Sequence, residues 1–455
     1  MPRISPVLPR AVLLAALACC CGCSNNEAGG GTGAEKLPPL QFPPDPEAID
    51  NLYEHSVLVA ETAVATFPGA VQPVFDLAQV HRRFGYNNEA IATYRRGLEI
   101  EPARPDAHLA IGFLASQRAE GEGGTSADFE AALDAYREAL QLDPDIAGAH
   151  TRIGMIYAHQ GELEKAIASY QREIATGNAG YELYFNLGQA LQLQGEHAAA
   201  VETLNKALDH EPDDLNALYA KFQAERAAGD GEQAQKTLEK WQSLREADGD
   251  SGDGTSEPLD RARELLYTCD AYYRAGLVYA DAGMEREALD HFRAALVFAP
   301  GNRGVALVLI EYLRSHGGAA RALEEGRGIL EAQPDNSELL YKLAGLASEL
   351  HERDVAEELL GRVLKIDTDH TDATRELARS MLFSPELDNS TFNAAMRLAH
   401  RAVELERSAA SLDVLAYGLF RAGKRAEAVR ALEEAVALDP ANAALRQRLE
   451  SVRAQ

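Results

Sequence analysis

Cysteine is nearly absent from the sequence, and after residue 23 the chain contains only one, Cys269. A single thiol cannot form an intramolecular disulfide, so the folded part of the chain is expected to be stable without one. Cys269 falls on a predicted helix, between Leu266 and Tyr272, and no histidine lies close by in the sequence. We interpret it as a small buried residue and not as a nucleophile.

Basic residues are also in short supply. The chain of 455 residues has 44 Lys and Arg against 71 Asp and Glu, which gives a formal net charge of −27. Such a charge repels a phosphate backbone and an anionic membrane surface, so we expect no nucleic-acid partner. The apolar content of 46% is that of a folded protein and excludes disorder throughout the chain.

The sequence has a single long apolar run, AVLLAALA, which follows Arg3 and Arg10. No acidic residue precedes Glu27. The run is too short to span a bilayer. A positive start, a short apolar run and then small residues are typical of a secretory signal, so residues 1–23 are predicted to be one.

Four cysteines, at positions 19, 20, 21 and 23, close this run. The tetrapeptide ALAC that ends at Cys19 resembles the lipobox of bacterial lipoproteins, whose cysteine becomes the acylated first residue. Cys23 is the rival acylation site. The alternatives are a plain cleaved signal peptide and a metal or redox site on the CxxC pair of Cys20 and Cys23, which no strand or helix frames. The lipoprotein resemblance implies an extracytoplasmic protein, anchored by lipid on the periplasmic face of a bacterium, at the outer membrane.

Residues 24–46 are rich in Gly and then in Pro, so they cannot bury enough apolar surface to fold and are predicted to be a disordered tether. Motifs of catalysis are missing: the sequence has no HExxH, no GxSxG, no Walker loop and no GxGxxG after a strand. We therefore expect no enzyme activity, no catalytic residue and no cofactor. The acidic stretch 246–260 offers carboxylates for calcium, but their order is wrong for an EF-hand. We interpret it as a solvated linker and expect no metal.

Strand patterns are almost absent, and apolar residues recur at helical spacing in segments broken by short turns, which predicts an all-helical fold. The segments repeat. Small residues lie 34 positions apart at Ala132, Ala166, Ala200 and Ala234, then at Ala288, Ala322 and Ala356, and again at Ala394 and Ala428. Prolines that close a helix pair follow the same period, as from Pro300 to Pro334.

The period and the pattern within it resemble the tetratricopeptide repeat. The best copy runs from Tyr272 to Pro300, with Gly276, Ala288 and Phe292 in the family's places. The resemblance implies an all-α, right-handed superhelical solenoid of antiparallel helix pairs, which needs stacked neighbours to bury its apolar faces. We expect about ten repeats, which start near Ala70, Pro105, Ala147, Tyr181, Asp213, Ala271, Gly301, Asp335, Asp369 and Ala409.

Insertions divide the predicted array. We expect an N-terminal block over residues 47–245, with a capping helix at 47–67 and five repeats. An acidic linker with a helical lead-in follows at 246–267, and then a C-terminal block of five repeats and a closing helix at 268–455. Smaller insertions fall at 119–127, at the turn between the two helices of a repeat, and near 384–392, both at the edge of the solenoid.

In the tetratricopeptide family, the first helix of each repeat lines a concave groove, at positions three before, one after and five after its small residue. Mapped onto this chain, the resemblance implies a peptide-binding groove. Its residues would be Phe75, Gln79, Leu109, Phe113, Gln117, Met155, Phe185, Gln189, Tyr219 and Gln223 in the N-terminal block, and Tyr273, Tyr341, Arg375 and Arg379 in the C-terminal block.

Gln79, Gln189 and Gln223 share one of these positions. A carboxamide side chain can donate a hydrogen bond to a peptide backbone and also accept one from it. The alternative is that several of the aromatics pack between helix layers. Arg375 and Arg379 lie one helical turn apart and would meet an acidic ligand, unless Asp372 or Glu376 balances them. The Lys and Asn of a chaperone-type carboxylate clamp are missing.

These observations predict a non-catalytic scaffold that binds peptides or partner proteins in its groove and touches the membrane only through an N-terminal lipid anchor. The lipoprotein-and-repeat layout is similar to that of outer-membrane lipoproteins that serve pilus secretin assembly or recruit cell-wall hydrolases. The alternative function is an assembly or stability subunit of an exported enzyme, a pilus or secretion system, or a cell-wall complex.

Overall fold

A computed structural model describes residues 40, 42–121, 123–247, 256–384 and 387–454. Within these ranges the chain forms a short 3-10 turn at Pro46–Ala48 and 22 α-helices, and it has no strand. The all-α prediction is confirmed. The helices are α2 Leu52–Thr66, α3 Val71–Arg83, α4 Asn87–Ile100, α5 Pro105–Glu120, α6 Ser126–Leu142, α7 Ala149–His159, α8 Leu163–Ala175, α9 Tyr181–Gln194, α10 His197–His210, α11 Leu215–Ala228, α12 Gly231–Ala247, α13 Ser256–Asp281, α14 Glu285–Phe298, α15 Arg303–Gly317, α16 Ala319–Ala332, α17 Ser337–Glu349, α18 Arg353–Ile366, α19 Thr371–Leu382, α20 Asn389–Leu405, α21 Ala409–Arg421, α22 Arg425–Leu438 and α23 Ala443–Ala454.

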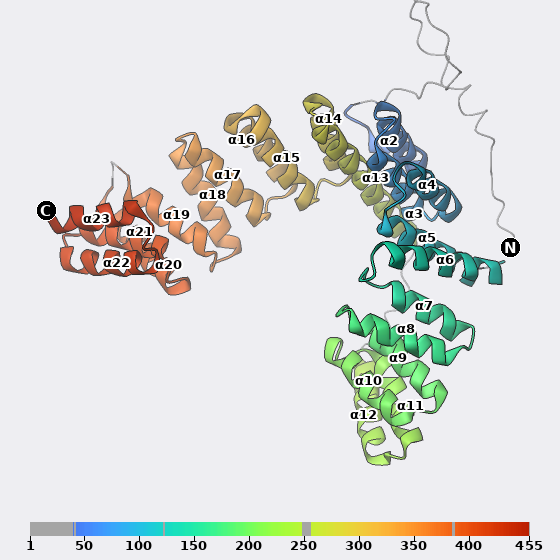
Figure 1. The fold of residues 1–455 in the computed structure, drawn as a ribbon. Coiled ribbons are helices and arrows are strands. Elements are labelled where there is room, and N and C mark those ends of the chain that lie inside the picture. The colour runs from blue at the N-terminus through green and yellow to red at the C-terminus, as the bar shows by residue number, and fades with distance from the viewer. Residues whose placement is uncertain (1–39, 41, 122, 248–255, 385–386, 455) are drawn as a thin grey trace, which may run out of the picture. The chain divides into compact units, whose positions relative to one another are not determined.

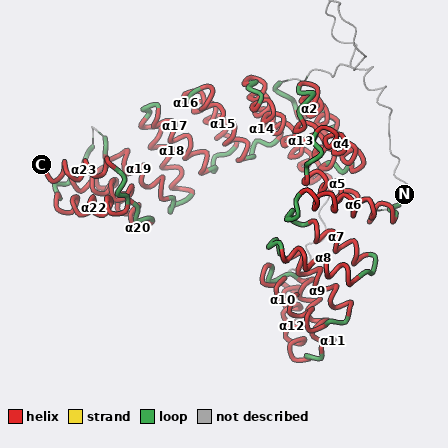
Figure 2. The backbone as a smooth tube through the Cα atoms, viewed as in Figure 1, coloured by secondary structure: helices red, strands yellow, loops and turns green. Residues whose placement is uncertain are grey.

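The helices pair in sequence order, from α3 with α4 to α21 with α22, and short loops join them (Figure 2). Nine of the ten predicted repeat starts fall within two residues of the start of the first helix of a pair. The exception is the sixth, because α13 begins at Ser256 and runs without a break to Asp281, so the predicted lead-in and the helix of the repeat are one element. The insertion at 119–127 includes the connection between α5 and α6, at the turn predicted for it, and the insertion at 384–392 overlaps the connection between α19 and α20 and the first turn of α20.

Local sequence explains where the helices start and stop. Asp214, Asn302 and Asn336 stand at N-caps, and their side-chain oxygens accept hydrogen bonds from backbone N–H groups three residues on, at 2.7, 3.2 and 3.1 Å. Each bond satisfies one donor that the first helical turn leaves unpaired. Gly229, which has a positive φ of 87°, ends α11 in the left-handed conformation that glycine adopts without strain.

Small residues allow the two helices of a repeat to approach closely. A Cβ atom added at Gly154 would lie 2.5 Å from the ring of Tyr170, and one added at Gly276 would lie 2.7 Å from the ring of Phe292. Both rings are fully buried. The aromatic side chain of the second helix therefore occupies the space that the glycine leaves, which confirms the role that the repeat pattern gives to these positions.

The two predicted blocks meet through α2, which packs against both α3 and α13 (Figure 1). Ser56 donates a hydrogen bond to the Thr268 hydroxyl at 3.0 Å, and Nε2 of His55 lies 2.8 Å from the Tyr272 hydroxyl. The expected capping helix is therefore not an exposed end of the array. The C-terminal block stacks on the start of the N-terminal block, whereas α12, the helix before the linker, packs on α11.

Buried side chains continue across this junction. One apolar core contains Leu52 and Val59 of α2 together with residues of α13 to α19. Cys269 belongs to it and is 1% exposed, which confirms that it is a small buried residue. Burial raises the pKa of its thiol to about 11, so it is a poor nucleophile.

The first described residues lie on the same junction. The Phe42 ring is 5.0 Å from the ring of His291, and Arg261 donates hydrogen bonds to the carbonyls of Pro46 and Ile49, at 3.1 and 3.2 Å. None of the described helices is both long and apolar enough to cross a membrane. The signal segment, its cysteines and most of the tether lie outside the described residues.

Candidate binding groove

The sequence-predicted groove residues of the N-terminal block form a mixed surface. Gln117, Gln189, Gln223 and Tyr219 are exposed, and the last of these is 44% exposed. The remaining residues that reach the surface are half-buried: Gln79, Leu109, Phe113, Met155 and Phe185. The surroundings of the aromatics differ, because Phe185 stacks on Tyr181 of its own helix with ring centres 5.7 Å apart, whereas Tyr219 is exposed.

Phe75 does not belong to this surface. It is 5% exposed and packs against Gly97 and Tyr94 of α4, and the Arg104 guanidinium covers its ring at 4.6 Å. The spacing rule placed Phe75 on the correct face of its helix. It could not predict that Arg104 covers that face. Phe75 is a core residue, and a peptide in the groove does not reach it.

Two aromatic groove residues of the C-terminal block also pack against their neighbours. Tyr273 lies beside Phe292, with ring centres 6.1 Å apart, and Tyr341 lies beside His370 at 5.0 Å. Both tyrosines are half-buried.

The two predicted arginines differ in their exposure. Arg375 forms ion pairs with Asp372, at 2.6 Å, and with Glu376, at 3.5 Å, and only 17% of its side chain is exposed. Arg379 pairs with Glu376 and keeps 56% of its side chain exposed. Local acids therefore balance both arginines, but Arg379 alone is open to a ligand.

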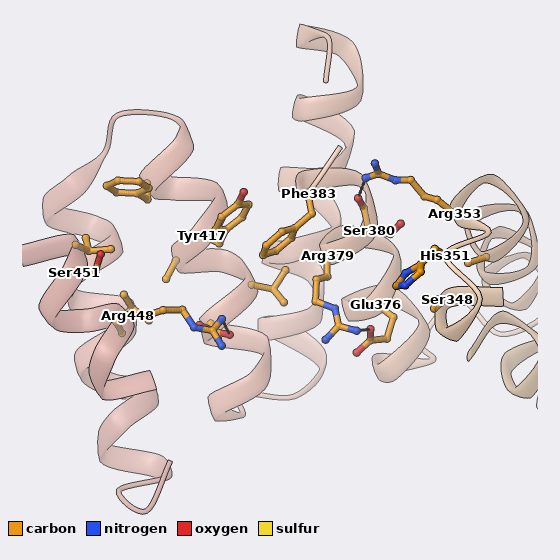
Figure 3. A pocket seen from close by; sticks show the side chains of 17 residues that line it. Ser348, His351, Arg353, Glu376, Arg379, Ser380, Phe383, Tyr417, Arg448 and Ser451 are labelled. Carbon is orange, nitrogen blue, oxygen red and sulfur yellow. Dashed lines mark hydrogen bonds and ion pairs between the residues drawn. The ribbon is translucent and has the colours of Figure 1, made fainter. Parts of the chain in front are cut away.

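Around Arg379 the structure opens into a hollow of about 820 Å³ (Figure 3). This C-terminal pocket lies on the first helices of two successive pairs, α19 and α21, and on the closing helix α23, and the turn between α17 and α18 borders it. It is lined by Ser348, His351, Arg353, Ala356, Glu376, Arg379, Ser380, Phe383, Asp413, Val414, Ala416, Tyr417, Phe420, Leu432, Arg448, Ser451 and Val452.

Two parallel aromatic rings stand in the middle of the C-terminal pocket. Phe383 and Tyr417 stack with ring centres 4.0 Å apart and planes that differ by 4°, and Figure 3 shows them face to face. Phe383 is 51% exposed, a large open area for an aromatic side chain. It offers a flat apolar surface against which a planar or apolar group of a ligand packs.

Charged groups flank these rings. Arg379 and Glu376 form one ion pair, and Arg448 forms another with Asp413. Burial raises the pKa of the Asp413 carboxyl above its ordinary value, and the Arg448 guanidinium opposes that rise. Oδ1 of Asp413 is buried and has no hydrogen-bond partner in the described part of the chain. The polar half of the pocket therefore holds two carboxylates and, in Arg379 and Arg448, two half-exposed cations.

Sequence reasoning missed most of this pocket, although the signal was present. Phe383 lies five positions after Ala378, so the groove rule that selects Arg375 and Arg379 selects it too. The same rule applied to Ala416 gives Asp413 and Tyr417. The groove residues predicted from the sequence do not include any from the last repeat. The closing helix, which supplies Arg448, carries no repeat signature.

The acidic stretch 246–260 lies largely outside the described residues. Elsewhere in the described ranges, no group of three or more His, Cys, Asp or Glu side chains is arranged to hold a metal ion.

Comparisons with known proteins place the repeats. Sequence profiles described as tetratricopeptide repeat match residues 72–104, 125–182 and 181–214. These matches lie within the N-terminal block, and the ordered helix pairs extend the same architecture to the C-terminal block. No curated protein matches the sequence.

Solved structures with a similar fold include MamA, from residue 41 to its end, of Desulfovibrio magneticus RS-1. It is 18% identical and covers 40% of this chain and 97% of its own, with a TM-score of 0.36. YrrB, described as a TPR protein with an unusual peptide-binding site, is 19% identical over 47% of this chain and 96% of its own, with a TM-score of 0.30. Yeast Tom70 is 14% identical over 85% and 96%, with a TM-score of 0.34. All three scores are below 0.5, so these likenesses carry no argument about function.

Proposed function

Because the chain is a tetratricopeptide-repeat protein, a class of protein–protein interaction scaffold, we propose that it captures a segment of a partner protein on its groove face without catalysing a reaction. The observation that carries this proposal is the C-terminal pocket, where two stacked rings and the exposed Arg379 lie on or directly after the first helices of two successive pairs, α19 and α21, and Arg448 of the closing helix α23 lies beside them. A peptide gains from such a surface through apolar contact and through charge-assisted hydrogen bonds.

The exposed glutamines of the N-terminal block support a second stretch of the same groove. Gln192 donates a hydrogen bond to Gln223 at 3.3 Å, so this face already pairs carboxamides between consecutive repeats. An extended peptide backbone makes the same type of contact. We infer that the two stretches contact separate parts of a partner, because they belong to different blocks, of which α2 contacts the first helices, α3 and α13.

Co-purification followed by quantitative mass spectrometry tests the proposal. The wild-type chain is compared with a Phe383→Ala, Arg379→Gln double variant and with the triple variant Phe113→Ala, Gln189→Ala, Tyr219→Ala. We expect the pocket variant to lose one stoichiometric partner while its helical content and melting temperature stay unchanged. If both folded variants retain every partner, the groove is not the binding surface.

We further propose that the chain is a lipoprotein on the extracytoplasmic side of a bacterial membrane, at the periplasmic face of the outer membrane. The ALAC tetrapeptide that ends at Cys19 and the apolar run before it support this proposal. Labelling with a radioactive fatty acid should be lost on Cys19→Ser and kept on Cys23→Ser, or the reverse if Cys23 is the acylated residue. Label that persists in the double variant would contradict acylation at these two cysteines, and a wild-type chain that takes up no label would contradict lipidation.

An assembly or stability role in an exported enzyme, a pilus or secretion system or a cell-wall complex is the second candidate. It predicts that the partner is degraded or mislocalised when this chain is absent. Simple capture predicts a partner that persists at a normal level but is no longer recruited. Immunoblotting of the partner in a deletion strain separates the two.

A further inference from the structure

The arginines near the C-terminal pocket fall into two classes. Arg353 donates to the Ser380 carbonyl and to Glu357, and Arg421 donates to the carbonyls of Leu382 and Ser384, so both serve to hold neighbouring helices together. Arg379 and Arg448 are different. Each is paired with one carboxylate of its surroundings, and their side chains are 56% and 48% exposed. A guanidinium carries five N–H donors, so one carboxylate leaves further donors for a ligand.

The pocket also departs from the charge of the whole chain. Acidic residues exceed basic ones by 71 to 44 in the sequence, yet the exposed charge in the pocket is mainly cationic. Arg379 and Arg448 are 56% and 48% exposed, whereas their partners Glu376 and Asp413 are only 24% and 17% exposed. Exposed guanidinium groups on a strongly acidic protein favour a negatively charged segment at this place.

The aromatic pair lies between the two half-exposed arginines. In Figure 3 the rings of Phe383 and Tyr417 stand between Arg448 on one side and Arg379 on the other. A ligand that packs an aromatic side chain on the open face of Phe383 therefore brings its neighbouring residues toward a guanidinium on each side. A flat ring gains from offset stacking there, and a guanidinium binds a carboxylate with directed, charge-assisted hydrogen bonds.

We propose that the C-terminal pocket selects a peptide segment in which side-chain carboxylates flank an aromatic residue. This inference rests on the proposed function and names the chemistry of the partner segment. The aromatic side chain packs on Phe383, and the carboxylates accept hydrogen bonds from Arg379 and Arg448. A segment rich in Lys or Arg is disfavoured, because the exposed Arg379 and Arg448 repel it, whereas the carboxylates of Glu376 and Asp413 are mostly covered, at 24% and 17% exposed.

Fluorescence anisotropy with short synthetic peptides tests the proposal on the full chain. The probe is an acetylated and amidated hexapeptide of alternating Glu and Phe, which carries no terminal charge. Matched peptides replace Glu by Gln, Glu by Lys, or Phe by Ala. We expect the Gln peptide to bind about tenfold more weakly than the Glu peptide, the effect of losing a charge-assisted hydrogen bond, and the Lys peptide more weakly still. The difference in affinity between the Glu and Gln peptides should decrease at high salt concentration.

Variants of the chain assign the effect to the pocket. Arg379→Gln should remove most of the preference for Glu over Gln, and Arg379→Lys should restore part of it. Phe383→Ala should weaken the Phe peptides and leave the Ala peptide unchanged. Arg96→Gln, an exposed change on α4 that removes the same charge outside the groove and the pocket, is the matched control and should alter none of these values. Arg379 and Phe383 are more than half exposed, so these changes leave the core intact.

Equal binding of the Glu and Gln peptides overturns the inference, and so does the absence of binding by any peptide at millimolar concentration. These outcomes are distinct from a failure of the proposed function. If the pocket variant loses its natural partner while charge makes no difference to the peptides, the groove binds a partner of another chemistry. If the pocket variant and the N-terminal triple variant both retain the partner, the proposed function itself is wrong.

Discussion

At the scale of single residues, packing of small against large side chains sets the spacing of the helices. Gly154 and Gly276 each face an aromatic ring at a distance that no Cβ atom tolerates, whereas Gly345, on the exposed side of α17, has nothing within 4 Å. Glycine therefore has two different structural roles in this fold. In the first case it makes room for a neighbour, and in the second it only costs helix propensity.

Alanine at these positions should act in opposite directions. We expect Gly154→Ala to lower the free energy of unfolding by about 1–3 kcal/mol, because its methyl group overlaps the Tyr170 ring. Gly345→Ala should raise it by about 0.5–1 kcal/mol. Urea denaturation measures both. A neutral Gly154→Ala would show that α7 and α8 are not held at this separation.

His291 gives the molecule a dependence on pH. Its Nδ1 lies 2.7 Å from the Glu287 carbonyl, so Nδ1 carries the hydrogen, and Nε2 is buried without a partner in the described residues. Burial lowers the pKa of the imidazole below its ordinary value of 6.5, an effect that the nearby Glu287 and Asp290 oppose. The folded chain thus holds the proton less tightly than the unfolded chain, so stability is full above pH 6.5 and falls as the pH drops below it.

The melting temperature should therefore decrease between pH 7 and pH 5, and His291→Leu should make that decrease smaller. His400→Gln, on the exposed side of α20, is the control and should leave the slope unchanged. An unaltered slope in His291→Leu would mean that this imidazole takes up its proton equally well in the folded and unfolded chain.

At the scale of elements, the sequence allowed the helix pairs to be predicted but not the way the blocks join. Nine repeat starts were placed within two residues, because each repeat carries its own small residues, caps and closing turn. The contact of α2 with α13 joins positions more than 200 residues apart, and no local pattern encodes it. The groove rule failed at Phe75 for a similar reason, since Arg104, which lies just before the next repeat, covers its ring.

Helix α2 should accordingly matter to both blocks. Leu52→Ala removes a fully buried side chain and is expected to cost about 2–5 kcal/mol of stability. Hydrogen exchange should speed up in both α3 and α13. Leu449→Ala, in the closing helix α23, should speed exchange only near the C-terminal end, because a repeat contacts chiefly its neighbours. Faster exchange in α3 alone after Leu52→Ala would contradict the observed packing.

At the scale of the whole molecule, the junction makes the linker dispensable for holding the blocks together. Arg274 of α13 pairs with Asp76 of α3 at 3.4 Å, and Arg83 of α3 pairs with Asp270 of α13 at 3.4 Å, in addition to the contacts of α2. A protease site placed within 248–255 should therefore yield two fragments that elute together in size-exclusion chromatography. Fragments that separate at low salt would show that the linker holds them.

Site-specific photo-cross-linking can show whether a partner protein binds at the C-terminal pocket. A benzophenone amino acid is placed at Phe383, and in a second variant at Glu358, an exposed position on the second helix of its pair. We predict that illumination of the native membrane fraction links one protein to position 383, through an acidic and aromatic segment, and nothing specific to position 358. A partner linked at position 358 and absent at position 383 would contradict the account.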